Sequence, residues 1–290
     1  MFVAGVDGCR DGWIVVGLDG GRFAGAGKYR TFREVVGAVP EAHAIGVDMP
    51  IGLVDEGERL CDRLARERVG PRRSSVFCVP PRSAIEAESY EDANAIALEL
   101  WGRGISTQLY NLRAKILEVD EVVRDAPRAP RRSSPQGARR KHPARLIKEK
   151  KENRASLLRY ARIVKPDHGQ TAKPAILVPE MREPGRAVAM RAGRIIEVHP
   201  ELSFRELAGA PLEYSKKTYN GVMTRLRLLE GAGVDIPAEL GSVGGVALDD
   251  VLDAAVAAWS SWRYVRGEAL SLPDASSWQH DGERVIAIWA

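Results

Sequence analysis

Short apolar runs near the N-terminus predict a set of β-strands. The stretches Phe2–Val6 and Gly12–Leu18 are rich in valine, isoleucine and aromatic residues, which favour strands. Residues 19–21, Asp-Gly-Gly, follow the second run and are typical of a hairpin turn. The small residues of Phe23–Tyr29 make a weaker third strand that would pair back on the second. The chain is therefore expected to open with three antiparallel strands.

A helix and a fourth strand are expected next. Thr31 and Glu34 have the spacing of a capping box, which predicts a helix over residues 32–39. Residues 44–47 are apolar and predict the fourth strand. Further helices are expected at residues 56–69, 90–101, 107–123, 203–208, 219–232 and 248–266, and further strands within 194–201 and 284–289.

Charge is distributed unevenly along the 290 residues. The net charge is only +4, yet residues 124–194 hold 20 lysines and arginines against 6 acidic residues. Prolines lie among arginine, serine and glycine in this stretch, as in linkers, and residues 146–164 have the pattern of a basic amphipathic helix. We expect one domain made of residues 1–123 and 194–290, and a basic insertion at 124–193. The insertion has the composition of a nucleic-acid-binding arm and equally that of a solvated segment.

Composition also bears on the compartment. No apolar run approaches the roughly 20 residues that cross a membrane, and the first strand has no basic stretch before it, so a signal peptide is not expected. The three cysteines, Cys9, Cys61 and Cys78, form no C-x-x-C pair. A disulfide framework is therefore not expected, and a reducing cytoplasm is.

Acidic residues recur where predicted strands end. Asp7 ends the first strand, Asp48 ends the fourth, and Glu197 lies in the late strand. Asp250 and Asp253 are three apart at the start of the long late helix, so they share one of its faces. Carboxylates brought together repel unless a cation lies among them. Oxygen ligands of this kind suit Mg²⁺ or Mn²⁺.

These acids suggest a hydrolytic site. Two ions roughly 3.5–4 Å apart can activate a water and stabilise the leaving oxygen of a phosphodiester. The hypothesis makes Asp7, Asp48, Asp250 and Asp253 metal ligands, with Glu197 beside or behind them. Taken alone, each has a simpler explanation. Asp7 fits a turn, Asp250 fits the positive end of a helix, and Glu197 fits the edge of a sheet.

Basic residues are candidates for holding phosphate. Arg72, Arg73 and Arg82 lie in a polar stretch after the second predicted helix, and a guanidinium binds phosphate through two hydrogen bonds. Lys216 and Lys217 suit the same role. The alternatives are salt bridges to the acidic body for the arginines and a surface patch at a helix entry for the lysines.

His199 is a further candidate. It follows Glu197 by two residues, so in a strand both side chains would point the same way. It would serve as a general acid or as a donor that organises the site. The alternative is a histidine satisfied by the nearby Glu201.

Several motifs together resemble a known family. They are Gly5–Arg10 with Gly12 and Trp13, Val47–Leu53, Gly70–Phe77, Pro81–Ala84, Gly104–Ser106, Lys115–Asp120, Glu197–Glu201 with Ser203 and Phe204, Ser215–Thr218, and Asp249–Ala254. They are similar to the predicted RNase H-like nucleases grouped as domain of unknown function 429, in which glycine is expected where this chain has Asp11. The late Asp-rich helix also resembles that of junction resolvases.

The resemblance implies an α/β fold of RNase H type. A mixed sheet would have three antiparallel strands followed by parallel strands, with helices on both faces. The implied activity is that of a metal-dependent nuclease, with nucleic acid as its partner and no membrane. Two alternatives stay open. One is an actin-like ATP-dependent phosphotransferase, for which the glycine-rich residues 241–245 are a faint adenosine-loop candidate. The other is a non-catalytic nucleic-acid-binding protein on the same scaffold.

Overall fold

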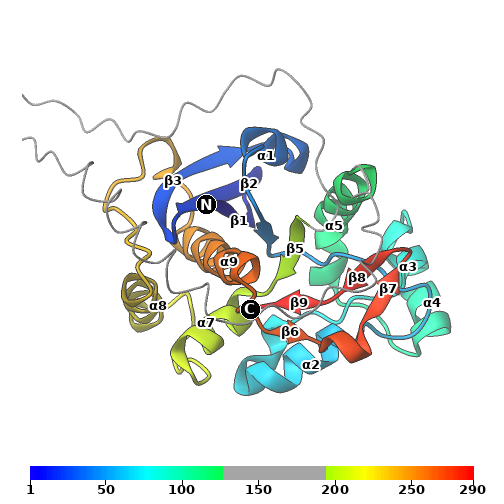
Figure 1. The fold of residues 1–290 in the computed structure, drawn as a ribbon. Helices are drawn as coiled ribbons and strands as arrows, with labels where there is room; N and C mark the ends of the chain where they lie inside the picture. Colours follow the sequence, from blue (N-terminus) through cyan, green and yellow to red (C-terminus); the bar gives the residue numbers. More distant parts are fainter. Residues whose placement is uncertain (127–193) are drawn as a thin grey trace, which may run out of the picture. The chain divides into compact units, whose positions relative to one another are not determined.

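A seven-stranded mixed sheet organises the protein (Figure 1). The computed structural model describes residues 1–126 and 194–290, which belong to one unit. The sheet has the order β3-β2-β1-β4-β5-β9-β6. Its strands are β1 (Phe2–Cys9), β2 (Gly12–Asp19), β3 (Arg22–Tyr29), β4 (Ile45–Val47), β5 (Ile195–Val198), β6 (Ser271–Leu272) and β9 (Ile288–Trp289). A separate hairpin joins β7 (Gln279–Asp281) and β8 (Arg284–Ile286).

Strand direction changes across the sheet. β1, β2 and β3 pair antiparallel, whereas β4, β5 and β9 follow β1 in parallel, and β6 closes the edge antiparallel to β9. All but the last residue of β2 are buried, because helices cover both faces of the sheet. This is the RNase H-like arrangement that the sequence predicts.

One face of the sheet packs against α1 (Phe32–Ala38) and α5 (Thr107–Asp125). The expected capping box begins α1, since the Thr31 hydroxyl accepts from the Glu34 amide at 3.2 Å and the Glu34 carboxylate accepts from the Thr31 amide at 3.3 Å. The core of this face includes Val6, Trp13, Val47, Phe32, Leu109 and Ile116.

The opposite face packs against α9 (Leu248–Arg266), which lies across the sheet with α7 (Pro200–Ala208) and α8 (Tyr219–Gly231) beside it (Figure 1). The alanine-rich sequence of α9 favours a helix, and Gly267 ends it in the left-handed conformation. The core of this face includes Val3, Ile14, Val16, Phe204, Leu229 and Val251.

The remaining elements are short helices and turns. They are α2 (Leu60–Val69), η1 (Gly70–Ser75), α3 (Arg82–Glu86), α4 (Tyr90–Trp101), η4 (Gly241–Val243) and η5 (Ala275–Ser277). α2 packs on the β9 end of the sheet, and α3 packs with α4 in a smaller cluster.

Most predicted elements are confirmed, and α4 and α9 have the predicted bounds. The predicted helix over 56–69 is four residues shorter, because Arg59, just before α2, is drawn into buried ion pairs. The strands β6 and β7 were not predicted, since each is too short to show a pattern. The helix expected over 146–164 lies outside the described residues.

Two further features bear on the predictions. Asp11, where the family resemblance expects glycine, has a φ of 60°, a left-handed conformation that glycine adopts most readily.

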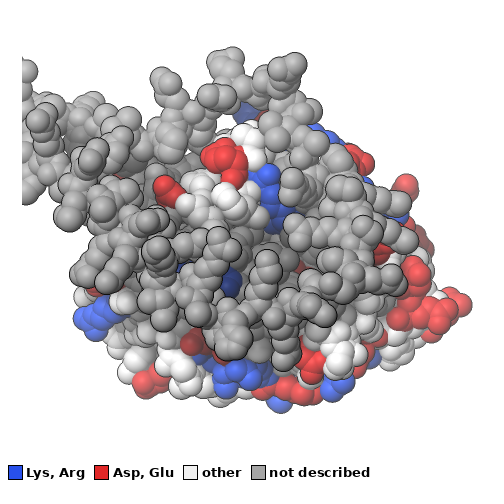
Figure 2. Space-filling model, viewed as in Figure 1, with Lys and Arg blue, Asp and Glu red and all other residues white. Residues whose placement is uncertain are grey.

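Among the described helices, none has the length and apolar character needed to span a membrane. Basic and acidic side chains alternate along the lower edge of the view in Figure 2.

Candidate metal centre

The site begins where the parallel pairing of β1 with β4 ends. β1 and β4 pair with Val6 opposite Val47, and the Asp48 amide donates to the Val6 carbonyl at 2.9 Å. The next residues, Asp7 and Asp48, therefore lie beside one another. Because side chains alternate along a strand, both point to the face that carries α9.

Two glycines let α9 approach that face closely. A Cβ on Gly5 would overlap the backbone of Ala254 and Ala258, and one on Gly46 would lie 2.8 Å from the Ala257 carbonyl oxygen. Gly5 precedes Asp7 by two residues and Gly46 precedes Asp48 by two, so each glycine shares the face of its aspartate. The helix therefore sits directly on the strands that carry Asp7 and Asp48.

This seating brings a third carboxylate into the group. Asp253 lies one helical turn before Ala257 on α9, and one oxygen each of Asp7, Asp48 and Asp253 lie within 4.8 Å of one another. Asp250, which the sequence makes an equal candidate, is outside this set of three. Its charge still acts on Asp7 and Asp48, so it lies at the margin.

Burial makes the negative charge of this group unfavourable. Asp7 and Asp253 are 7% and 2% exposed. Burial, followed by repulsion from Asp48 and Asp253, raises the pKa of Asp7 well above its usual value. Burial and then Asp253 raise the pKa of Asp48 to about 8. Burial raises the pKa of Asp253 to about 6, against the opposing effect of Lys216. A divalent cation would relieve this strain.

The donor set fits a hard cation. It consists of carboxylate oxygens, the ligands that Mg²⁺ and Mn²⁺ prefer. The Gly8 amide donates to Asp7 Oδ1 at 2.7 Å, which orients that carboxylate. Among the described residues, no hydrogen bond to the Asp48 carboxylate is present, so its oxygens are available as ligands. These three aspartates are the residues that would hold the ion.

Lys216 occupies a place that the sequence did not predict. Its ammonium forms an ion pair with Asp253 and lies 4.0 Å from Asp249 Oδ2, and phosphate binding by this lysine stays a prediction. Burial opposes the charge of Lys216, but the carboxylates of Asp253, Asp7 and Asp48 raise its pKa. The lysine is therefore a cation held at the edge of the carboxylate group. Lys217 is exposed.

Glu197 is not part of this group, which corrects the sequence prediction. It pairs in register with Val47, so it points to the opposite face of the sheet from Asp48. There it forms a buried ion pair with Arg59, and its Oε2 accepts from the Ile51 amide at 2.8 Å. Burial raises the pKa of Glu197 to about 7, and Arg59 opposes that rise.

Arg59 joins two carboxylates in a second buried cluster. Its Nη1 lies 3.3 Å from Asp62 Oδ1, and Asp62 Oδ2 accepts from the Val79 amide at 2.8 Å. Cys61, Asp62 and Glu197 each place a ligand atom within 4.8 Å of the others, but the guanidinium already supplies the cation. Sequence reasoning missed Arg59 and Asp62, because nothing local distinguishes a buried arginine from the many exposed ones.

His199 is engaged by the backbone at both ring nitrogens. It caps α7, where Nδ1 accepts from the Leu202 amide at 3.4 Å, and Nε2 lies 3.1 Å from the Ser75 carbonyl oxygen. The proton therefore belongs on Nε2, and burial lowers the pKa of the ring. The expected general acid is thus a neutral side chain that fastens η1 to the start of α7.

The expected arginine ligands of phosphate separate into three cases. Arg82 is committed to carboxylates, with Asp120 at 2.6 Å and Asp281 at 2.7 Å, and so ties the β7–β8 hairpin to α5. Arg72 donates to the carbonyls of the segment before Lys216. Arg73 is exposed, and its binding of substrate phosphate stays a prediction.

The glycine-rich stretch 241–245 forms a tight turn. It contains η4, and Val243 within it is 1% exposed and belongs to the core beside α9. The other four residues of the stretch are exposed, and the adenosine loop of the phosphotransferase alternative stays a prediction.

The chain matches one family model, described as "Protein of unknown function (DUF429)", over residues 5–173 and 136–277. The chain belongs to this family. No curated protein and no solved structure matches it. Asp7 and Asp48 fall in the first matched range of the DUF429 model and Asp253 in the second, so all three carboxylates lie within the part of the chain that DUF429 describes.

Proposed function

We propose that this protein is a metal-dependent hydrolase that cleaves phosphodiester bonds of nucleic acid. The supporting observation is the convergence of Asp7, Asp48 and Asp253 at one end of an RNase H-like sheet, with oxygens within 4.8 Å of one another. Carboxylates crowded together with raised pKa values repel one another when charged, and perturbed pKa values of this kind cluster at functional sites. A bound divalent cation would offset the repulsion.

Phosphodiester hydrolysis needs an activated water and a stabilised leaving oxygen. Hydrolysis forms a bond between a water oxygen and phosphorus and breaks the bond to one ester oxygen, while water gives up a proton and the leaving alcohol gains one. A divalent ion, when bound, polarises a phosphoryl oxygen and acidifies water. The three aspartates would hold the ion, and the Gly8 amide fixes the orientation of Asp7.

Basic groups lie around the carboxylates. The charge of the exposed Lys217 interacts favourably with that of Asp250. The charge of Lys115 interacts favourably with those of Asp7 and Asp250. Lys115 donates to the Gly12 carbonyl at 2.6 Å and stacks over the Trp13 ring at 4.2 Å, so its position is fixed. The phosphates of a nucleic acid at the site would be attracted by both lysines. Phosphate contacts of this kind provide affinity without sequence preference.

The test uses the full chain against DNA, RNA, hybrid and junction substrates. We expect cleavage of at least one substrate with Mn²⁺ or Mg²⁺, none with a chelator, and none with Asp7→Asn. Asp11→Gly is the matched control, because it changes a neighbouring exposed aspartate without touching the three ligands. Cleavage that is equal for Asp7→Asn, or a panel left intact by the metal-loaded protein, would contradict the proposal. Calorimetric ATP binding with an intact panel would favour the phosphotransferase alternative.

A further inference from the structure

Lys216 is the closest cation to the carboxylate group among the described residues. Its ammonium pairs with Asp253 and lies 4.0 Å from Asp249. It also interacts electrostatically with Asp7 and Asp48. A single positive charge is thus already placed among the side chains that would hold a metal.

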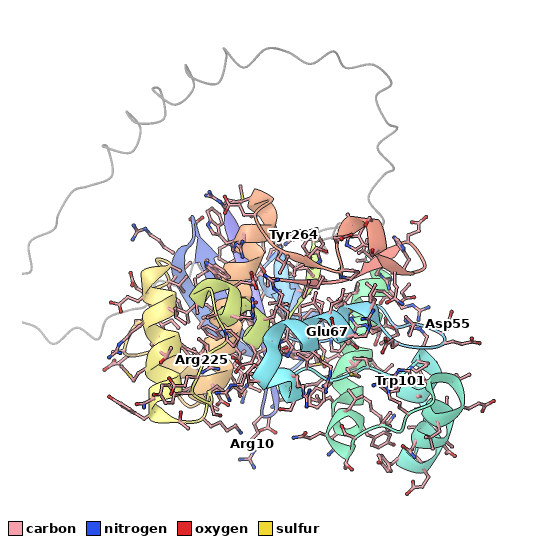
Figure 3. The ribbon with its side chains drawn as sticks, turned by 90° about the horizontal axis from the view of Figure 1, so that it is seen from below. Arg10, Asp55, Glu67, Trp101, Arg225 and Tyr264 are labelled. Carbon is pink, nitrogen blue, oxygen red and sulfur yellow. The ribbon has the colours of Figure 1, made fainter. Side chains whose placement is uncertain are left out.

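The segment that carries this lysine is fastened to the body. Arg72 donates to the carbonyls of Leu212 and Glu213, and Arg225 donates to the carbonyl of Tyr214 at 3.2 Å. Arg225 is fully buried and forms an ion pair with Glu201; Figure 3 shows it between α8 and α7. The backbone leading to Lys216 is therefore held by two arginines.

The other side of the segment is equally constrained. A Cβ on Gly221 would overlap the Ser215 carbonyl, so the chain before Lys216 packs directly on α8. Thr218 ends the segment by capping α8, with its hydroxyl accepting from the Gly221 amide at 3.1 Å. Arg10, by contrast, projects from the β1–β2 turn away from the body (Figure 3). Lys216 is thus a positioned cation and not a loose surface lysine.

Charge counting decides how many ions fit. Three carboxylates carry three negative charges, and one divalent ion with one ammonium balances them. A two-metal site needs ions roughly 3.5–4 Å apart that share bridging ligands, and the fourth aspartate that would serve the second ion, Asp250, stands outside the set of three. Charge and ligand number therefore both favour one divalent ion beside Lys216.

We propose that the Lys216 ammonium takes the place of a second metal ion, so that the site binds one divalent cation per chain. This rests on the proposed function and specifies how that site works. An ammonium has three donors, and pairing with Asp253 uses one. The remaining donors would be available to a phosphate oxygen bound beside the ion.

The test counts bound Mn²⁺ by equilibrium dialysis and records its electron paramagnetic resonance spectrum. The unaltered chain is expected to bind one uncoupled ion, which Asp253→Asn loses. Lys216→Met is expected to bind a second ion, or to bind its ion about tenfold or more tightly, because a repelling charge is removed. The matched control Lys217→Met, and Lys216→Arg, should keep the stoichiometry of the unaltered chain.

Two results would overturn the inference. One is a pair of exchange-coupled ions in the unaltered chain, both lost in Asp253→Asn. The other is a Lys216→Met variant that matches Lys217→Met in ion number and affinity. If Lys216→Met does not fold, the unaltered chain and Lys216→Arg decide by their ion count. Two bound ions together with cleavage would contradict this inference but not the nuclease proposal. One bound ion with an uncut substrate panel would contradict the nuclease proposal but not this inference. The absence of any bound ion would contradict both.

Discussion

Asp7 and Asp253 come from opposite ends of the described chain, yet their carboxylate oxygens lie within 4.8 Å of one another and of Asp48. Asp7 lies in the central strand β1, and Asp253 lies on the helix that crosses it. The backbones that carry them are held together because α9 packs directly on Gly5 and Gly46. The site is therefore part of the core packing, and its electrostatics and the stability of the fold are linked.

The two helix aspartates should differ in importance. Asp253→Asn removes a member of the carboxylate group, whereas Asp250→Asn changes a residue at its margin. We expect Asp253→Asn to weaken Mn²⁺ binding by about 100-fold or more and Asp250→Asn by about tenfold, the lower end of the range for residues around a metal site. Titration calorimetry of both variants checks this, and equal losses would contradict the assignment.

The metal-free protein should lose stability as the pH rises. Burial and mutual repulsion raise the pKa of Asp48 from 3.8 to about 8, so over that range the native state holds protons that the unfolded chain has released. The free energy of unfolding then falls with increasing pH. We expect urea midpoints in a chelator to be lower at pH 8 than at pH 5, and Mn²⁺ to restore the loss.

Removing the charge of Asp48 should stabilise the fold, as a bound metal ion should. Asp48→Asn should stabilise the metal-free protein at pH 8 by about 1–4 kcal/mol, the Coulomb range for unit charges 4 Å apart near a surface, while abolishing cleavage. Its midpoint should also depend less on pH than that of the unaltered chain. A destabilised Asp48→Asn would show that its carboxylate has a supporting partner instead of repelling ones.

A side chain at Gly46 should destabilise the fold. Gly46→Ala would push a methyl group against the Ala257 carbonyl and Ser261, lifting α9 and destabilising the fold by about 1–3 kcal/mol. Gly37→Ala is the matched control, since it lies inside α1 with open space around it. Alanine there should be neutral or add up to about 1 kcal/mol. Thermal unfolding of both variants measures the difference.

The second buried cluster should be structural. Arg59→Met leaves Glu197 and Asp62 buried without their cation, which should cost about 3–5 kcal/mol of unfolding free energy. Adding Glu197→Gln to Arg59→Met should recover part of that loss, because one uncompensated charge disappears. Chemical denaturation of the single and double variants tests this, and a double variant less stable than the single one would refute it.

Local sequence determined the parts of the site that depend on one element. Strand patterns correctly put Asp48 directly after a strand, whereas β1 continues two residues beyond Asp7, to Cys9. The three-residue spacing put Asp250 and Asp253 on one helix face. The capping box at Thr31 and Glu34 and the extent of α9 also followed from neighbouring residues. These features are set by backbone periodicity and by hydrogen bonds within a few residues, which the sequence contains directly.

Tertiary structure decided which charges meet. Only the seating of α9 on Gly5 and Gly46 selected Asp253 over Asp250. Only the register of β5 turned Glu197 to the opposite face, and only folding gave Lys216 and Arg82 their carboxylate partners. Periodicity says which residues share a face, but not which distant element that face will contact, and a charged side chain takes its role from that partner.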